Sequence, residues 1–291
     1  MKVRIDRDTT MHYVLGDPIR HSLSPTIYNT LYSRYQMNVV CLTAHVPKGQ
    51  LKAFFDARDF FRVSAINATI PHKSDILAFA DTVDEEALRY QSVNTIAIRD
   101  DGLHAYSTDA EGFVLSMAEQ GVSFTGQHVA LLGAGGAAAP IALRAAHEKA
   151  TSILILARRM ESANDLRLKI QQISDIPCTV ALLDDVASRI VDSTLLINTT
   201  PLGMAGFGAD FPSFDFLDSL PKNAVVCDIV YNPSVTALLH HAQMRHLKTI
   251  GGLGMLIWQA FAAFKIFYDQ LPNGHDFSAV CSALAEQGFS V

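Results

Sequence analysis

The stretch His128-Val-Ala-Leu-Leu-Gly133-Ala134-Gly135-Gly136-Ala137-Ala138 decides the fold of this chain. A short aliphatic run leads into the spacing Gly133-x-Gly135-x-x-Ala138 and then into an alanine-rich segment with helical periodicity. In dinucleotide-binding βαβ units, the first glycine permits a tight turn and the second lets the backbone approach a pyrophosphate, while a small third residue keeps helix and strand close. The helix N-terminus adds free N–H groups for the phosphates. The stretch therefore predicts a dinucleotide-binding turn, although glycine–alanine turns also occur in plain βα connections.

Short apolar runs alternate with segments of helical periodicity along most of the chain. Strands are predicted at residues 12–16, 39–46, 63–70, 93–98, 128–133, 153–157, 179–183, 195–198, 224–230 and 249–251. Apolar spacing near 3.6 predicts helices at residues 50–61, 111–120, 137–147 and 236–246. This alternation is typical of an α/β fold with mostly parallel sheets. Strands after residue 121 are almost purely aliphatic, as strands covered on both faces are, which indicates a domain boundary there.

The residues after the second strand of the βαβ unit bear on which dinucleotide binds. An acidic residue at that strand end accepts hydrogen bonds from the ribose of NAD, whereas a basic residue suits the 2′-phosphate of NADP. This chain has Arg158 and Arg159 there, and a guanidinium group binds phosphate through paired hydrogen bonds. The arginines favour NADP. Glu161 lies two residues further on and leaves NAD open.

Composition excludes several functional classes. The chain has 291 residues, 49% of them apolar, and a formal net charge of −6 without a basic cluster, so a nucleic-acid-binding surface is not expected. No run reaches the roughly 20 apolar residues of a membrane span. The charged start at residues 1–8 is unlike a signal peptide. The four cysteines are too widely spaced for a disulfide framework or a zinc site. We expect a cytoplasmic protein with small-molecule partners, either a monomer or a homodimer.

Polar residues gather at strand ends in the N-terminal half. Ser22 and Ser24 follow the first predicted strand, and Ser24 before Pro25 could simply cap a helix. Asn67 and Thr69 alternate with apolar residues at the end of another strand. Such alternation indicates one strand face that is solvated or binds something polar. The same stretch ends in Pro71-His72-Lys73, and Asn94 and Asp109 stand at later strand edges.

These segments resemble the shikimate dehydrogenase family over nearly the whole chain. The matching segments are Ser22-x-Ser24-Pro25, Asn67-x-Thr69-x-Pro71-His72-Lys73, Val93-Asn94-Thr95, Thr108-Asp109, the turn Gly133-Ala134-Gly135-Gly136-Ala137, Asn198-Thr199-Thr200-Pro201-Leu202-Gly203-Met204, Asp228-Ile-Val-Tyr231-Asn-Pro233 and Gly254-Met255-Leu256-Ile-Trp-Gln259-Ala260. The resemblance implies a mixed α/β substrate domain at residues 1–121, completed by helices at about 252–291, and a Rossmann-like NAD(P) domain at residues 122–251.

The resemblance also implies an activity, the reversible NADP-dependent reduction of 3-dehydroshikimate to shikimate in the chorismate pathway to the aromatic amino acids. Lys73 and Asp109 would be the catalytic pair. The implied substrate-binding residues are Ser22, Ser24 and Tyr231 at the carboxylate and Asn67, Thr69, Asn94 and Gln259 at the ring hydroxyls. The implied cofactor-binding residues are Gly133, Ala134, Gly135, Gly136, Ala137, Arg158, Arg159, Thr199, Met204, Ile229, Gly252 and Met255. No metal is implied, because the cofactor performs the redox step.

Several positions depart from the commonest family pattern. Ser107 replaces the asparagine that usually precedes Thr-Asp, and Ala157-Arg158-Arg159 replaces the usual Asn-Arg-Thr. These departures leave open a quinate/shikimate dehydrogenase or a related paralogue that uses NAD. Two other classes are alternatives: a non-catalytic dinucleotide-binding regulator, and a metal-dependent hydrolase using His240, His241 and His246. Adjacent histidines point to different sides of a helix, which disfavours the metal site.

Overall fold

The chain forms two compact units, each built on one six-stranded sheet. The computed structural model describes residues 5–290. One unit runs up to Gly112 and also includes Ile257–Ser290, and the other comprises Phe113–Leu256. Both breaks fall inside helices, α4 (Asp109–Glu119) and α9 (Gly252–Tyr268). The C-terminal segment thus belongs with the N-terminal unit, as the predicted returning helix requires.

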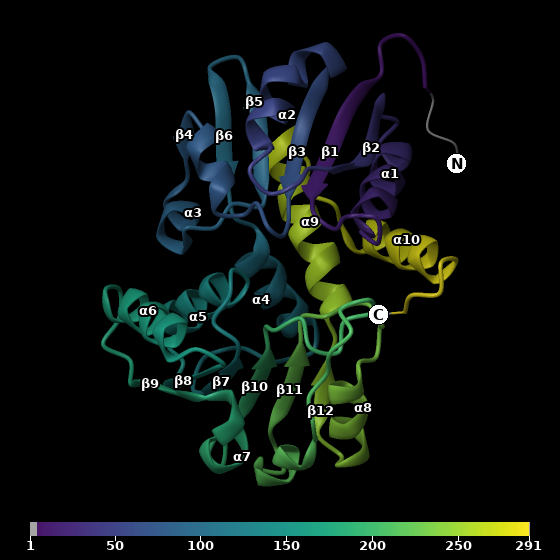
Figure 1. Ribbon diagram of the computed structural model, residues 1–291. Helices are drawn as coiled ribbons and strands as arrows, with labels where there is room; N and C mark the ends of the chain where they lie inside the picture. Colours follow the sequence, from purple (N-terminus) through teal and green to yellow (C-terminus); the bar gives the residue numbers. More distant parts are fainter. Residues whose placement is uncertain (1–4, 291) are drawn as a thin grey trace. The chain divides into compact units, whose positions relative to one another are not determined.

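The sheet of the first unit is mixed (Figure 1). In spatial order its strands are β2 (Val39–His45), β1 (Thr10–Gly16), β3 (Val63–Ala68), β5 (Thr95–Arg99), β6 (Gly102–Tyr106) and β4 (Thr82–Val83). Strand β1 runs parallel to β2 and β3, while β5 runs antiparallel to both β3 and β6. Strands β4 and β6 were not predicted, because β4 has only two residues and the apolar alternation in β6 is brief; β6 follows β5 through a hairpin turn of two charged residues that leads into Gly102. A left-handed φ of 133° at Gly102 makes that turn possible.

The helices of the first unit are α1 (Ser24–Arg34), α2 (Leu51–Ala57), α3 (Glu85–Tyr90) and α10 (Gly274–Ala285), with 3₁₀ turns at Arg58–Phe61 and Asp75–Phe79. A buried carboxylate joins α10 to the end of α1. Asp276 accepts hydrogen bonds from Arg34 Nε at 2.6 Å and from the Tyr35 hydroxyl at 2.9 Å. It also completes a capping box with Asn273 at the start of α10. This clamp fixes the C-terminal segment on the first unit.

The sheet of the second unit is entirely parallel. In spatial order its strands are β12 (Lys248–Ile250), β11 (Val225–Asp228), β10 (Leu195–Asn198), β7 (His128–Leu132), β8 (Ser152–Ala157) and β9 (Cys178–Leu182). Its helices are α5 (Ala138–His147), α6 (Met160–Gln171), α7 (Val186–Arg189) and α8 (Ala237–Met244), with 3₁₀ turns at Leu183–Asp185 and Asp215–Ser219. Figure 1 shows α5 and α6 beside β7–β9, and α8 beside β12. Every residue of β10 and β11 is buried, which explains their aliphatic sequences.

The α/β class and the parallel second sheet are therefore confirmed, whereas several strands are shorter than predicted. The strand predicted to reach residue 230 ends at Asp228, because this side chain accepts a hydrogen bond from Val230 N and bends the backbone out of the sheet. The strand predicted to reach residue 70 ends at Ala68, where His72 N bonds to Thr69 O in a turn.

Asp228 is a buried carboxylate at the carboxyl end of β11. Asn198 Nδ2 donates to its Oδ1 at 2.9 Å, and Thr236 donates to its Oδ2 at 2.7 Å. Burial raises the pKa of Asp228 to about 6, although these hydrogen bonds act in the opposite direction. The pKa of an aspartate in the unfolded chain is about 3.9. The folded protein therefore takes up this proton at a higher pH than the unfolded chain.

Replacing Asp228 tests this pH linkage. Because the folded pKa is raised, its contribution to stability is greatest near pH 4 and is lost as the pH rises through about 6. The free energy of unfolding of wild type relative to Asp228→Asn should fall by about 3 kcal/mol between about pH 3 and pH 7, a range that contains both pKa values. Urea unfolding at several pH values measures it. Parallel pH curves for the two proteins would contradict the raised pKa.

Candidate active site

An ion pair between Lys73 and Asp109 forms the centre of the polar cluster in the first unit. Lys73 Nζ lies 2.5 Å from Asp109 Oδ2, and the two side chains are 19% and 6% exposed. Lys73 follows β3, where Val93 N donates to its carbonyl and buried His72 bonds through Nε2 to Val46 O at 2.7 Å. Asp109 begins α4, where the positive end of the helix dipole stabilises a carboxylate. Local structure thus fixes both partners.

Two amide side chains lie beside this pair. Asn94 Nδ2 is 3.0 Å from Asp109 Oδ1 and 3.1 Å from Gln259 Oε1, while Asn94 Oδ1 accepts from Thr108 N at 2.9 Å. Gln259 comes from α9 and approaches α4 closely because residue 112 is glycine. A Cβ at Gly112 would lie 2.6 Å from the Gln259 backbone nitrogen. The close packing of α4 and α9 at Gly112 therefore places Gln259 in the cluster.

The serine loop lies at the same edge of the first sheet, after β1. Leu23, not Ser24, occupies the N-cap position of α1, and its side chain makes no capping hydrogen bond. The interpretation of Ser24 as a helix cap is therefore wrong. Ser24 is buried, and its backbone N–H donates to Ser22 Oγ at 3.3 Å. Neighbouring β3 continues into Thr69, whose N–H donates to Leu15 O. The serines and Thr69 thus follow adjacent parallel strands.

Asn67 is buried in β3 and is tied to the same cluster. Its Nδ2 donates to Asn94 O at 2.8 Å and to Thr95 Oγ1 at 3.0 Å, and its Oδ1 bonds to His12 Nε2 at 2.8 Å. Both amide hydrogens are used within the protein. The Tyr28 phenol also contacts Asn67, so at most the second lone pair of Oδ1 is available to a ligand.

The structure brings most of the predicted catalytic and substrate-binding residues into one unit. The exception is Tyr231, which follows β11 in the second unit; burial raises the pKa of its phenol, which keeps the hydroxyl available as a donor. Sequence reasoning missed His12, which contacts Asn67 directly. The available signal was a lone histidine within the apolar strand at residues 12–16.

The predicted cofactor-binding residues collect at the carboxyl edge of the second sheet. The turn at residues 133–137 follows β7, and Arg158 and Arg159 follow β8. Thr199 follows β10, and its N–H and hydroxyl both donate to Leu132 O. Ile229 follows β11, and a Cβ on Gly252 would collide with its carbonyl oxygen. This edge is where open parallel sheets bind nucleotides.

The glycine turn fits a dinucleotide phosphate. Gly133 has a φ of 108°, and a Cβ there would lie 2.8 Å from Thr199 Oγ1, so no other residue fits without strain. Gly135 and Gly136 are exposed, with open space where a Cβ would project. Helix α5 starts without a side-chain cap or an acid in its first turn. Its N-terminal N–H groups therefore face an uncrowded position for an anion.

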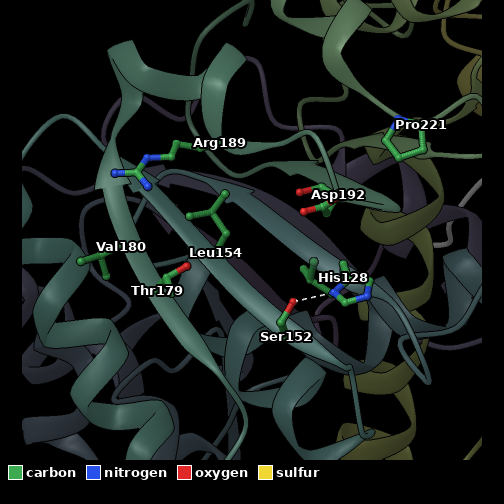
Figure 2. A pocket seen from close by; sticks show the side chains of 10 residues that line it. His128, Ser152, Leu154, Thr179, Val180, Arg189, Asp192 and Pro221 are labelled. Carbon is green, nitrogen blue, oxygen red and sulfur yellow. Dashed lines mark hydrogen bonds between the residues drawn. The ribbon is translucent and has the colours of Figure 1, made fainter.

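The described residues form a hollow away from this arrangement, but neither a cluster for a metal ion nor a helix that could cross a membrane. A hollow of about 500 Å³ opens beside the opposite, amino-terminal ends of the strands of the second unit, where the His128 ring bonds to Ser152 Oγ (Figure 2). The described residues contain no group of three or more histidine, cysteine or acidic side chains placed for a metal ion. Helices long and apolar enough to cross a membrane are likewise missing from the described part of the chain.

Comparisons with known proteins find relatives along nearly the whole chain. The family model of the shikimate dehydrogenase substrate binding domain matches residues 14–96. The shikimate dehydrogenase (NADP(+)) of Alkaliphilus metalliredigens is 35% identical, over 92% of this chain and 94% of its own. A crystal structure of a shikimate dehydrogenase in complex with NADP⁺ superposes with a TM-score of 0.88 at 29% identity, covering 98% of this chain and 97% of that one. The Thermus thermophilus enzyme in complex with NADP(H) and shikimate gives a TM-score of 0.80 at 26% identity, covering 94% and 100%.

The resemblance inferred from the motifs is thereby confirmed, together with the two-part fold it implied. Both comparisons span nearly the full length of this chain and of its relatives. The chain belongs to the shikimate dehydrogenase family.

Proposed function

We propose that this protein is an oxidoreductase that reversibly reduces 3-dehydroshikimate to shikimate with NADPH, a step of chorismate and aromatic amino acid biosynthesis. The observation that carries the proposal is the Lys73–Asp109 pair, with Asn94 bonded to the second carboxylate oxygen of Asp109. A non-catalytic regulator has no need for an ammonium and a carboxylate held 2.5 Å apart among hydrogen-bonding amides. Relatives over nearly the whole chain support it.

The ion pair suits the chemistry of a carbonyl reduction. Negative charge develops on the carbonyl oxygen as it is reduced, and the Lys73 ammonium stabilises that charge and delivers a proton to the oxygen. Asp109 holds the ammonium in place through Oδ2, while Asn94 occupies Oδ1. The carboxylate therefore has a fixed orientation throughout the reaction.

The remaining polar residues divide the substrate between them. We propose that Ser22, Ser24 and Tyr231 bind the carboxylate, and that Thr69, Asn94 and Gln259 bind ring hydroxyls. Asn67 is limited to accepting a hydrogen bond through Oδ1, since both of its amide hydrogens are already donated. Retention of both serines favours shikimate over quinate, whose extra hydroxyl beside the carboxylate needs room in this loop.

The carboxyl edge of the second sheet would hold the cofactor. Backbone N–H groups at residues 133–137 and the start of α5 would bind the pyrophosphate, and Arg158 and Arg159 the 2′-phosphate. Thr199, Met204, Ile229, Gly252 and Met255 would border the nicotinamide end. When bound, the nicotinamide supplies the hydride. Both arginines are exposed and follow β8 directly, which supports NADP over NAD.

The broader assignment has further parts. We propose that the functional domains are residues 1–121 with 252–291 and residues 122–251, that the protein works in the cytoplasm, and that it is a monomer or homodimer. The second candidate function is a quinate/shikimate dehydrogenase that uses NAD. Glu161 in the first turn of α6, beside the arginines, is the feature that favours it.

Removing the Lys73 ammonium tests the catalytic role. Lys73→Ala should lower kcat for shikimate oxidation about 100-fold or more. The variant lacks the group that accepts the hydroxyl proton in oxidation and returns it to the carbonyl oxygen in reduction. NADP binding should stay within about twofold of wild type, by fluorescence titration. Lys52→Ala is the matched control, since Lys52 forms an exposed ion pair with Asp56 at 2.7 Å in the same unit. Full turnover by Lys73→Ala would refute the assignment.

Arg158→Ala tests cofactor recognition. The dissociation constant for NADP should rise about tenfold, because a charge-assisted hydrogen bond to phosphate contributes on the order of 1.5–3 kcal/mol, while that for NAD changes little. Arg189→Ala serves as the control, because Arg189 lies beside the hollow at the other end of the strands. Equal losses for both dinucleotides would show that Arg158 does not contact the 2′-phosphate.

Initial rates separate the two candidate functions. Shikimate and quinate are each assayed with NADP and with NAD, following absorbance of the reduced nicotinamide. We expect kcat/KM to be highest for shikimate with NADP. Comparable turnover of quinate, or a preference for NAD, would favour the second candidate and make Glu161→Ala the next variant.

A further inference from the structure

His12 is a buried histidine that the proposed mechanism does not use. It lies in the middle of β1 with its side chain fully buried, and both ring nitrogens have partners. Nδ1 lies 2.7 Å from the Tyr32 hydroxyl, and Nε2 lies 2.8 Å from Asn67 Oδ1. A buried imidazole with two short hydrogen bonds holds its neighbours in fixed orientations.

The partners determine where the proton of His12 sits. Asn67 Nδ2 faces Asn94 O, which can only accept, so Asn67 Oδ1 must face the ring. An amide oxygen accepts only, and Nε2 therefore carries the hydrogen. Burial lowers the pKa of His12 to about 3, so the ring is neutral and Nδ1 is left as an acceptor. The ring is thus held in one tautomer.

Two tyrosines continue this arrangement away from the site. Because Nδ1 of His12 is an acceptor, the Tyr32 hydroxyl donates its one hydrogen to it. The Tyr268 hydroxyl, 3.0 Å away on α9, then donates to the Tyr32 oxygen. Tyr32 belongs to α1, so the bonds connect two helices to β1, the second strand of the sheet. We call Tyr268, Tyr32, His12 and Asn67 the tyrosine–histidine chain.

Beyond Asn67, a series of hydrogen bonds donated in the same direction leads to the Lys73–Asp109 ion pair. Asn67 Nδ2 donates to Thr95 Oγ1 at 3.0 Å, and the Thr95 hydroxyl donates to Asn94 Oδ1 at 3.0 Å. Asn94 Oδ1 accepts from both Thr95 and the backbone N–H of Thr108, so its Nδ2 is the atom that faces Asp109 Oδ1. The two amide nitrogens each face more than one acceptor, Asn67 Nδ2 facing two and Asn94 Nδ2 three, and no step requires a reversed amide.

We propose that His12 is a positioning residue for the reaction: together with the backbone groups Asn94 O and Thr108 N, it holds the amide of Asn67 and, through Thr95, that of Asn94 beside Asp109. It does not touch the substrate. Its contribution is orientational, because an amide can rotate by half a turn and exchange its donor for its acceptor. A buried donor without an acceptor is costly, so the series favours one arrangement. This inference rests on the proposed function for its kinetic consequence but not for the proton positions.

The proton positions are measured directly by nitrogen NMR. Protein with ¹⁵N-labelled histidine is compared with His12→Gln to assign the His12 signals. We expect Nε2 to carry the hydrogen and Nδ1 to remain unprotonated throughout the range from about pH 5 to pH 8. A hydrogen on Nδ1, or a doubly protonated ring in that range, would overturn the proposal whether or not shikimate is the substrate.

Paired variants test the kinetic consequence. His12→Phe keeps a ring but removes both hydrogen bonds, whereas the side-chain amide of His12→Gln offers one donor and one acceptor. We expect His12→Phe to lower kcat/KM for shikimate about tenfold, the factor for one hydrogen bond to a buried group, with KM for NADP within about twofold of wild type. His12→Gln should recover kcat/KM to within about threefold. Equal losses in the two variants would overturn the proposal.

Tyr35, which directly follows the last residue of α1, offers a matched control for Tyr32. Tyr32→Phe removes a hydroxyl from the chain, whereas Tyr35→Phe removes one that bonds to Asp276 at 2.9 Å instead. Thermal unfolding should show both variants folded, but only Tyr32→Phe should lower kcat/KM. The double variant His12→Phe/Tyr32→Phe should lose no more than His12→Phe alone, because the two act in series. An equal kinetic loss in Tyr35→Phe would mean that helix stability, not orientation, is responsible. Absence of shikimate turnover in wild type would refute the proposed function and leave the NMR result as the test of the chain.

Discussion

The candidate site depends on the hydrogen bonds made by the side-chain amide of Asn94. Its oxygen accepts from Thr108 N, and its nitrogen faces both Asp109 Oδ1 and Gln259 Oε1. These partners come from the start of α4 and from α9, so a single carboxamide ties a strand end to two helices. If a buried amide loses a hydrogen-bond partner, the unpaired group stays desolvated at a cost in free energy. The hydrogen bonds around Asn94 are therefore expected to form or break together.

The two sheets place functional side chains by the same rule. In the first unit, the serine loop and Thr69 follow the carboxyl ends of the adjacent parallel strands β1 and β3. In the second unit, the glycine turn, the arginines and Thr199 follow β7, β8 and β10. Parallel strands end at one edge, so residues far apart in sequence meet there without long connecting loops. The mixed first sheet adds Asn94 through β5, which enters antiparallel to β3.

Local patterns in the sequence predicted the second unit better than the first. Aliphatic strands, the glycine spacing and helical periodicity are local signals, and they gave β7, β8, β10 and α5 to within one or two residues. The hairpin partner β6 was missed, because its residues Leu103–Tyr106 alternate too briefly to stand out. Lys73 and Asp109 could be paired only through a family resemblance, since nothing local links residues 36 positions apart. His12 had no signal beyond its type, because its role depends on contacts with α1 and β3.

The placement of Gln259 has a consequence for how the protein is made. Most of the polar cluster is encoded before residue 113, but its last member lies in α9, after the whole second unit has been synthesised. A ribosome therefore releases a nearly complete nucleotide-binding unit before the cluster around Asn94 can close. Shortened chains that end before α9 would keep the ion pair and the serine loop yet lack both Gln259 and Tyr268. The site can therefore be completed only after the second unit has been translated. Gly112 is translated early, yet its lack of a side chain is required by α9, which is translated after the second unit.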